Sequence, residues 1–123
     1  MQENLCLVSL GSNTNSDVNV AAAQFRLIDF FGLVYFSSAV YTEPIGMPNR
    51  KKFLNQVAQF KTHLLQEDVV KVLKSIEKGV GRDPKDKVNI VVDLDLLRFN
   101  GEVLKPDDME RQYIKVGIEE LNK

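Results

Sequence analysis

Apolar residues recur along the chain with a spacing that alternates between the periods of strands and helices. The first apolar run covers 5–10 and stops at the polar turn Gly11-Ser12-Asn13. Helical spacing follows and predicts a helix that Ser16 or Asp17 caps and Gly32 ends. We expect the apolar stripe of this helix to consist of Val18, Ala21, Ala22, Phe25 and Ile28.

Two strands and a second helix are predicted in the middle of the chain. The strands cover 33–41 and 53–60, and the loop between them ends in the basic run 50–52. The helix opens at Gln66 and ends near Gly79 or Gly81. Its expected apolar stripe is Val69, Val70, Val72, Leu73 and Ile76.

The segment after this helix, 82–87, is polar and contains a proline, so we expect a loop rather than regular structure. The strand predicted next covers 91–97, and the pair Asn100-Gly101 predicts a two-residue hairpin behind it. A last helix should begin at 106–108 and be interrupted by Gly117. Its expected apolar residues are Met109, Tyr113, Ile114, Val116 and Leu121.

This order of elements predicts an α+β fold. Strand, helix, strand, strand, helix and strand form the ferredoxin-like βαββαβ arrangement, a mainly antiparallel sheet with helices packed on one face. We expect the strand over 91–97 to lie near the middle of this sheet, in one domain that covers 1–123.

Two carboxylates lie inside that otherwise apolar strand. Side chains alternate along a strand, so Asp93 and Asp95 share one face while Val92, Leu94 and Leu96 point into a core on the other. Two like charges in this position need compensation. Mg²⁺ with its preference for oxygen ligands is one candidate, and an Arg or Lys on a neighbouring strand is the alternative.

Composition narrows the function classes. The net charge of −1 comes from interspersed charges of both signs, which gives no general case for binding nucleic acid or an anionic membrane. No apolar run is long enough to span a bilayer, and we expect a cytoplasmic protein. The single cysteine, Cys6, lies in the first apolar run and is interpreted as a packing residue.

Several short motifs in one order carry a resemblance along nearly the whole chain. They are Leu10-Gly11-Ser12-Asn13, Thr42-Glu43-Pro44-Ile45-Gly46, Phe53-Leu54-Asn55, Ile76-Glu77 with Gly81-Arg82, and Asp93-Leu94-Asp95. Together they resemble 6-hydroxymethyl-7,8-dihydropterin pyrophosphokinase of folate biosynthesis. The resemblance implies that the pterin hydroxymethyl oxygen attacks the β-phosphorus of ATP, so that diphosphate is transferred and AMP leaves.

The resemblance also implies roles for particular residues. Asp93 and Asp95 would hold two Mg²⁺ ions, and Arg82 would join them as a catalytic group. The ATP-binding residues would be Glu77, Arg82, Lys85, Lys87 and Arg111. The pterin-binding residues would be Thr42, Pro44, Ile45, Phe53, Asn55 and Tyr113. Such a reaction needs positioning and charge neutralisation rather than a covalent nucleophile.

The chain departs from the family pattern at two charged positions. Ile90 occupies the position of an Arg that usually precedes the aspartate pair by three residues, and Asp107 follows Pro106 where the family has a His. The resemblance stops at Lys123, where the family usually has a further carboxy-terminal segment. Besides an active enzyme we therefore consider a paralogue that binds pterin or nucleotide without turnover, and a non-catalytic interaction module. We expect a monomer or a weak homodimer.

Overall fold

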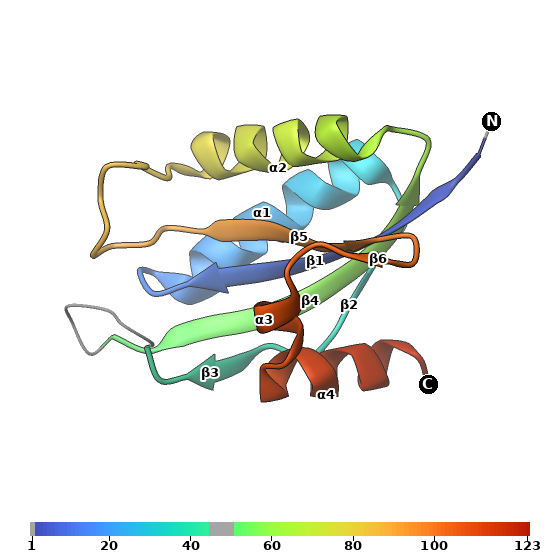
Figure 1. Cartoon of the computed structure of the whole chain (residues 1–123). Coiled ribbons are helices and arrows are strands. Elements are labelled where there is room, and N and C mark those ends of the chain that lie inside the picture. The colour runs from blue at the N-terminus through green and yellow to red at the C-terminus, as the bar shows by residue number, and fades with distance from the viewer. Residues whose placement is uncertain (1, 45–50) are drawn as a thin grey trace.

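The computed structural model describes residues 2–44 and 51–123. The elements follow the predicted order, except that one predicted strand and the last predicted helix are each divided in two (Figure 1). The elements are β1 (Asn4–Ser12), α1 (Ser16–Phe31), β2 (Val34–Phe36), β3 (Val40–Thr42), β4 (Phe53–Thr62), α2 (Gln66–Val80), β5 (Asp93–Phe99), β6 (Glu102–Val103), α3 (Pro106–Met109) and α4 (Gln112–Leu121).

The strands form one antiparallel sheet in the order β2-β4-β1-β5-β6, and β3 also pairs with β4. This is the predicted ferredoxin-like arrangement. The strand with the two aspartates was expected near the middle of the sheet. It lies next to the middle, because β1 and β4 are the central strands. Strand β5 lies between β1 and the two-residue β6, which pairs only with Arg98 and Phe99. In the part of the chain that the structure describes, most of the outer edge of β5 therefore has no strand beside it.

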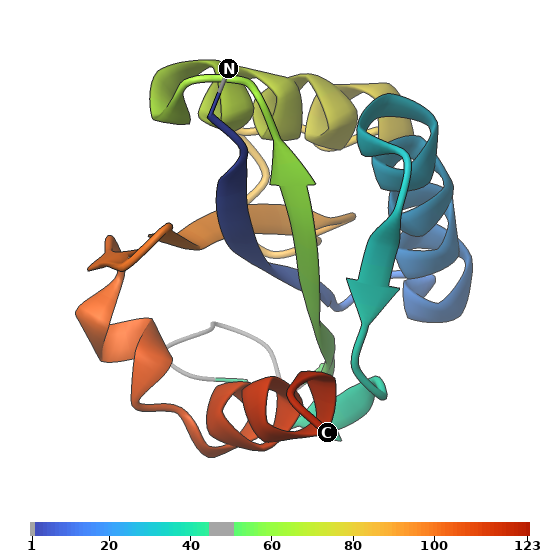
Figure 2. The ribbon, with the colours of Figure 1, turned by 90° about the vertical axis from the view of Figure 1, so that its right-hand side faces the viewer.

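The sheet is covered on both faces (Figure 2). Helices α1 and α2 pack on one face, over a core that contains Val8, Leu10, Ala58, Leu94 and Leu96. Helix α4 packs on the opposite face over a smaller cluster of Leu7, Val57, Leu97 and Ile114. Each fully buried aliphatic side chain contributes roughly 1.5–3 kcal/mol of transfer free energy. The smaller cluster covers only part of its face, and the aspartates of β5 lie on the same face.

The apolar stripes of the helices differ from the prediction. Helix α1 buries Val20, Ala23 and Leu27, whereas Val18 and Phe25 are 66% and 71% exposed. Two apolar stripes with helical spacing run along α1, and periodicity alone does not choose between them. In α2 the predicted stripe is correct for Val69, Leu73 and Ile76, while Val70 and, in α4, Val116 lie on exposed sides.

The predicted strand over 33–41 is split into β2 and β3 by a bulge. Phe36 pairs with Ala58 and Val40 with Asn55, so 37–39 oppose only 56–57. Ser37 compensates for the break in the ladder. Its N–H donates to Val57 O at 2.9 Å, and its Oγ accepts the Val57 N–H at 2.9 Å.

The chain reversals confirm some local predictions and correct others. The hairpin between β5 and β6 turns at Asn100-Gly101 as predicted, with Asn100 at φ 55°. Gly32 ends α1 at φ 85°. The predicted cap by Ser16 or Asp17 is wrong, because Asn15 precedes the helix in a left-handed conformation without a side-chain cap.

The predicted last helix is two helices, α3 and α4, separated by Glu110 and Arg111. Gly117 does not interrupt α4 but lies inside it and is buried. No helix among the described residues is long and apolar enough to cross a membrane.

Candidate functional site

The two aspartates of β5 open into a cavity of about 260 Å³ on the α4 side of the sheet. The cavity is lined by Ser9, Leu10, Gly11, Thr42, Glu43, Phe53, Asn55, Asp93, Asp95, Asp108, Arg111, Tyr113 and Ile114. Strand ends of β1, β3, β4 and β5 form its floor, and the α3–α4 region contributes the opposite wall. Residues far apart in the sequence thus meet at one place.

This cavity gathers many of the predicted site residues. Those that line it are Thr42, Phe53, Asn55, Asp93, Asp95, Arg111 and Tyr113. Pro44, Glu77, Arg82, Lys85 and Lys87 are not among the lining residues. Ile45 falls outside the residues that the structure describes. Ser9, Glu43 and Asp108 line the cavity and were not predicted; Asp108 could have been suggested by its i,i+3 spacing from Arg111.

The aspartate pair is poorly neutralised by the protein. Burial and, to a smaller extent, the charge and hydrogen bonding of Asp93 together raise the pKa of Asp95 to about 6, against the charges of Lys105 and Lys74, which lower it. Arg82 Nη1 lies 3.8 Å from Asp93 Oδ1, which is beyond hydrogen-bond distance. Within the described ranges no Lys or Arg forms an ion pair with Asp95. Arg82 is therefore the only side chain of the described residues that forms an ion pair with either aspartate.

The donor set fits a hard divalent cation that brings further ligands with it. Two carboxylates on one strand face supply oxygen ligands, and burial together with the neighbouring Asp93 raises the pKa of Asp95, so a bound cation would favour its charged form. Among residues 2–44 and 51–123, no three His, Cys, Asp or Glu side chains gather as a metal-ligand group. Mg²⁺ is commonly held by one or two carboxylates together with water and substrate phosphates, which agrees with this arrangement.

Asn55 lies on the cavity floor in β4, with Gly11 of β1 between it and Asp93. Its side chain is buried, and Nδ2 donates to Thr42 Oγ1 at 2.5 Å and to Phe53 O at 3.3 Å. A Cβ atom at Gly11 would lie 3.4 Å from Asn55 Oδ1 and 3.7 Å from Phe53 Cδ1. The absence of a side chain at Gly11 therefore leaves the amide and the aromatic ring accessible from the cavity.

The α3–α4 region supplies a cation and an aromatic ring. Arg111 Nε lies 3.2 Å from Asp108 Oδ1, an ion pair between two cavity residues. Burial raises the pKa of Tyr113 above its usual value. The cavity thus combines an acidic end at β5 with one guanidinium and two aromatic rings, those of Phe53 and Tyr113.

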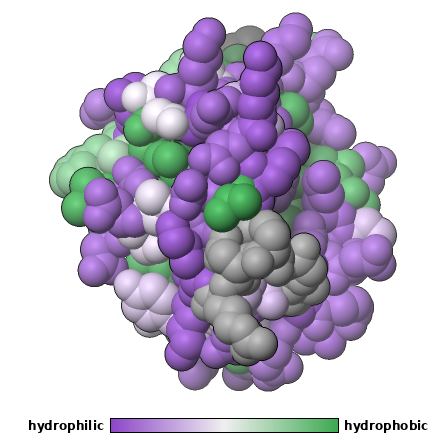
Figure 3. Space-filling view, turned by 90° about the vertical axis from the view of Figure 1, so that its left-hand side faces the viewer, coloured by the Kyte–Doolittle hydropathy of each residue, from purple (hydrophilic) through white to green (hydrophobic). Residues whose placement is uncertain are grey.

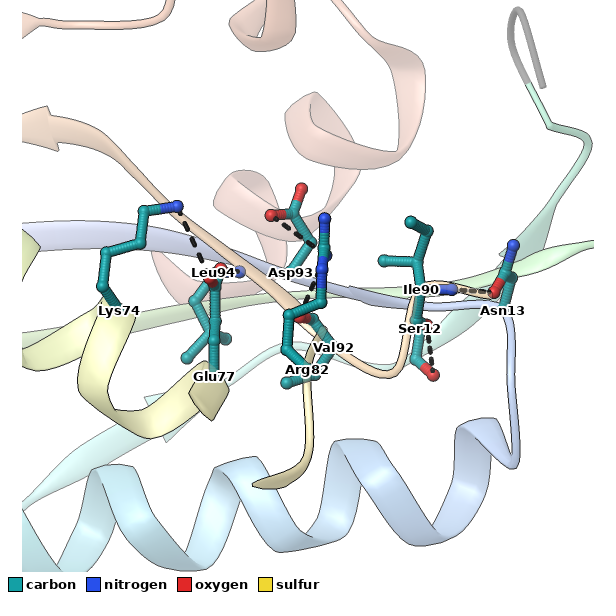
Figure 4. A network of polar contacts seen from close by, with 9 residues as sticks. All are labelled: Ser12, Asn13, Lys74, Glu77, Arg82, Ile90, Val92, Asp93 and Leu94. Atoms are coloured by element: carbon teal, nitrogen blue, oxygen red, sulfur yellow. Dashed lines mark hydrogen bonds and ion pairs between the residues drawn. The ribbon is translucent and has the colours of Figure 1, made fainter. Parts of the chain in front are cut away.

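Polar side chains hold the segment that leads into β5 (Figure 4). Asn13 Oδ1 accepts the Ile90 N–H at 2.7 Å, and Asn13 Nδ2 donates to Val88 O at 2.9 Å. Ile90 itself is buried, so no side-chain donor is presented at this position. Asn13, directly after β1, therefore anchors the approach to the aspartate strand, and the predicted turn is corrected because Gly11 and Ser12 belong to β1.

The remaining predicted residues lie around this strand rather than in the cavity. Glu77 and Arg82 come from the end of α2 and contact the outer edge of β5 (Figure 4). Lys85 and Lys87 are exposed on the 82–89 turn, which Lys51 approaches through a 2.6 Å hydrogen bond from its Nζ to Asn89 Oδ1. Figure 3 shows that the surface on this side of the molecule is mostly hydrophilic.

The amino-acid sequence is similar to those of several known proteins. The family model described as 7,8-dihydro-6-hydroxymethylpterin-pyrophosphokinase matches residues 7–123. A 2-amino-4-hydroxy-6-hydroxymethyldihydropteridine pyrophosphokinase from Aquifex aeolicus is 30% identical over 80% of this chain and 62% of its own length. The enzyme of that name from Bacillus subtilis is 26% identical over 96% of this chain and 78% of its own. A folate synthesis bifunctional protein from Arabidopsis thaliana is 34% identical over 63% of this chain and 16% of its own.

The chain spans less than two thirds of the length of the Aquifex and Arabidopsis relatives. The family match nevertheless covers nearly all of the described residues, including every residue that lines the cavity. The chain belongs to the 7,8-dihydro-6-hydroxymethylpterin-pyrophosphokinase family.

Proposed function

We propose that this protein transfers diphosphate from ATP to 6-hydroxymethyl-7,8-dihydropterin, the reaction that the resemblance implies and that the names of its relatives describe. The observation that carries the proposal is the cavity itself. It joins the aspartate pair of β5 to Asn55 and Phe53, so a planar polar ring and a phosphate chain could be held next to each other. The pterin belongs to the amide and aromatic part, and the phosphates belong to the acidic part.

The pterin-binding residues follow from their chemistry. The Phe53 and Tyr113 rings offer faces for stacking a planar heterocycle. Asn55, fixed by Thr42, offers an amide to the polar edge of that ring. Pro44 and Ile45 remain proposed members of this pocket from the resemblance, the first outside the cavity lining and the second outside the described residues.

Asp93 and Asp95 would hold two Mg²⁺ ions, which when bound neutralise the phosphate chain and orient the β-phosphorus. The protein's own part is to orient the substrates and exclude water. In the proposed step a bond forms between the pterin hydroxymethyl oxygen and the β-phosphorus, the bond from that phosphorus to the oxygen that AMP retains breaks, and the hydroxymethyl proton is released to solvent. No side chain needs to form a covalent intermediate.

Cationic side chains would complete the ATP site. Arg111 already lines the cavity, and Arg82 lies next to Asp93. Lys85 and Lys87 are exposed outside the cavity, so their contact with ATP requires the 82–89 turn to approach the phosphates. The proposal further places the protein in the cytoplasm as a monomer or a weak homodimer.

The direct test mixes the protein with ATP, Mg²⁺ and 6-hydroxymethyl-7,8-dihydropterin and measures AMP. Wild-type protein should release AMP only when the pterin is present. Asp95→Ala should release none above background, whereas Asp29→Ala, which removes an exposed carboxylate of α1, should match the wild type. AMP release that Asp95→Ala leaves unchanged would contradict the proposal.

One observation favours a second candidate, a protein that binds the substrates without turnover. Ile90 is buried and its backbone is held by Asn13, so this position supplies no positive charge to a transition state. Removing one such donor typically lowers the rate by about 10²-fold or more. Binding of pterin and Mg²⁺-ATP with no AMP formed would identify this second function.

A further inference from the structure

Among the described residues, no strand lies along the outer edge of β5 beside the aspartates. Strand β6 reaches only Arg98 and Phe99, while β1 pairs with the other edge. Backbone N–H and C=O groups at such an edge still need partners when they are buried. Two side chains supply these partners, Glu77 from the last turn of α2 and Arg82 from just after the helix (Figure 4).

Glu77 accepts a hydrogen bond from the backbone N–H of Leu94, the residue between the two aspartates. Its Oε2 accepts the Leu94 N–H at 2.6 Å in a buried hydrogen bond, and its side chain is only 8% exposed. Burial raises the pKa of Glu77, while the Leu94 bond and Lys74 Nζ, 3.4 Å from Oε1, act in the opposite direction. The nearby Asp93 carboxylate adds to the increase. A short hydrogen bond to a carboxylate is stronger than one between neutral groups.

The same residue ends the helix. The Glu77 carbonyl accepts the N–H groups of Gly81 at 3.2 Å and Arg82 at 2.9 Å. Arg82 then donates from Nη1 to Val92 O at 3.3 Å. Val92 O and Leu94 N–H point to the same edge of β5, so the two side chains occupy the place of an adjacent strand.

Leu94 lies between Asp93 and Asp95 in the strand, so its peptide groups set the direction of both carboxylates. Glu77 is not among the residues that line the cavity. We propose that Glu77 is a positioning residue, which fixes the β5 backbone through Leu94 so that the two aspartates face the cavity. The effect of Glu77 on Mg²⁺ binding rests on the proposed function, in which the aspartates hold the metal. Glu77 then has a role other than contact with ATP.

The test compares Glu77→Ala, which removes the acceptor, with Glu77→Gln, which keeps an oxygen acceptor without the charge. Glu67→Ala removes an exposed carboxylate from the first turn of the same helix and serves as the matched control. Amide hydrogen exchange by NMR reports the Leu94 N–H in the full chain without nucleotide. Titration with Mg²⁺ alone, followed by the amide signals of Asp93 and Asp95, reports metal affinity.

Glu77→Ala should speed exchange at Leu94 by about tenfold or more, because a hydrogen bond to a charged group is lost. It should weaken Mg²⁺ binding by about 10-fold to 100-fold, the usual effect of removing a residue that orients a metal ligand. Exchange at Leu10 on β1 should stay slow, which shows that the variant is folded. Glu77→Gln should restore most of both properties, and Glu67→Ala should change neither.

Three results would overturn the inference. Unchanged Leu94 exchange in Glu77→Ala would show that the bond does not hold the edge. Losses in Glu77→Gln as large as in Glu77→Ala would show that the charge acts rather than the hydrogen bond. A wild-type protein whose amide signals do not respond to Mg²⁺ would overturn the proposed function and, with it, the positioning role of Glu77. If Leu94 exchange in that protein is still slow and depends on Glu77, the hydrogen bond exists and only the metal-binding claim has failed.

Discussion

Gly117 of α4 lies directly against Val57 of β4, and a Cβ atom at position 117 would overlap Val57 Cγ2. This contact sets how closely α4 approaches the sheet. Because Tyr113 and Ile114, earlier in the same helix, line the cavity, the contact also sets the position of one cavity wall. The close packing of α4 on the sheet therefore requires a glycine here, although glycine in a helix interior lowers helix stability.

Gly117→Ala should lower the free energy of unfolding by about 1–3 kcal/mol, because overpacking displaces α4 and exceeds the gain in helix propensity. Denaturant unfolding measures this, with Val116→Ala at a 50% exposed position of the same helix as the control. Combining Gly117→Ala with Val57→Ala should cost less than the two single losses added together. If the two losses in free energy of unfolding simply add, the Gly117–Val57 contact does not limit the packing of α4.

Asp95→Asn should stabilise the metal-free protein. The folded-state pKa of Asp95 is raised from 3.8 to about 6 by burial and by Asp93. Its contribution to stability is therefore fully present below pH 3.8 and is lost as the pH rises through about 6. At neutral pH the substitution should raise the free energy of unfolding by about 1–2 kcal/mol, a value reduced for partial solvent screening.

Denaturant unfolding at several pH values would follow this gain for Asp95→Asn. The gain should shrink as the pH falls toward 3.8, where the wild-type carboxyl is also protonated. Asp29→Asn should show no such gain at any of these pH values. A destabilised Asp95→Asn protein at neutral pH would contradict the account of an uncompensated carboxylate.

Mg²⁺ affinity should depend on the protonation of the same residue. A metal ligand must be ionised, so protons compete with Mg²⁺ below the Asp95 pKa of about 6. The apparent Kd for Mg²⁺ should be nearly constant above this value and rise by about tenfold per pH unit below it. Calorimetric titration across this range gives the profile. A Kd for Mg²⁺ that does not change as the pH falls below 6 would show that Asp95 does not bind the metal.

Asn55→Ala should weaken pterin binding by about 10-fold to 100-fold, because the polar edge of the ring loses a fixed amide partner. Fluorescence titration with the pterin measures the Kd directly. Gln59→Ala is the matched control, since Gln59 lies on the same strand and face but does not line this cavity. Equal losses of pterin affinity in the two variants would show that Asn55 does not contact the pterin.

Local sequence signals predicted much of the fold because their physical causes are local. The Asn100-Gly101 pair favours a tight hairpin, and Gly32 ends a helix, whatever the rest of the chain does. The alternation of Asp93 and Asp95 with Leu94 likewise follows from strand geometry alone. These features could be predicted without knowledge of their neighbours in space.

Features that depend on distant partners could not be predicted. Helix α1 carries two apolar stripes, and only packing against α2 and the sheet selects the one with Ala23. The break at Ser37 could be predicted only with knowledge of the strand opposite it, which bonds to Ser37 through Val57. The packing role of Gly117 likewise depends on its contact with Val57. The side chain of Glu77 was expected to face ATP, whereas its bond to Leu94 joins residues 17 positions apart.

The most direct measurement of the central claim follows a label placed on the β-phosphorus of ATP. If Asp93 and Asp95 serve diphosphate transfer, the label should appear in the pterin product together with the γ-phosphorus, and unlabelled AMP should form in equal amount. Both products should depend on Mg²⁺ and disappear in Asp95→Ala. Label that remains in ADP or in unreacted ATP while the pterin stays unmodified would contradict the account.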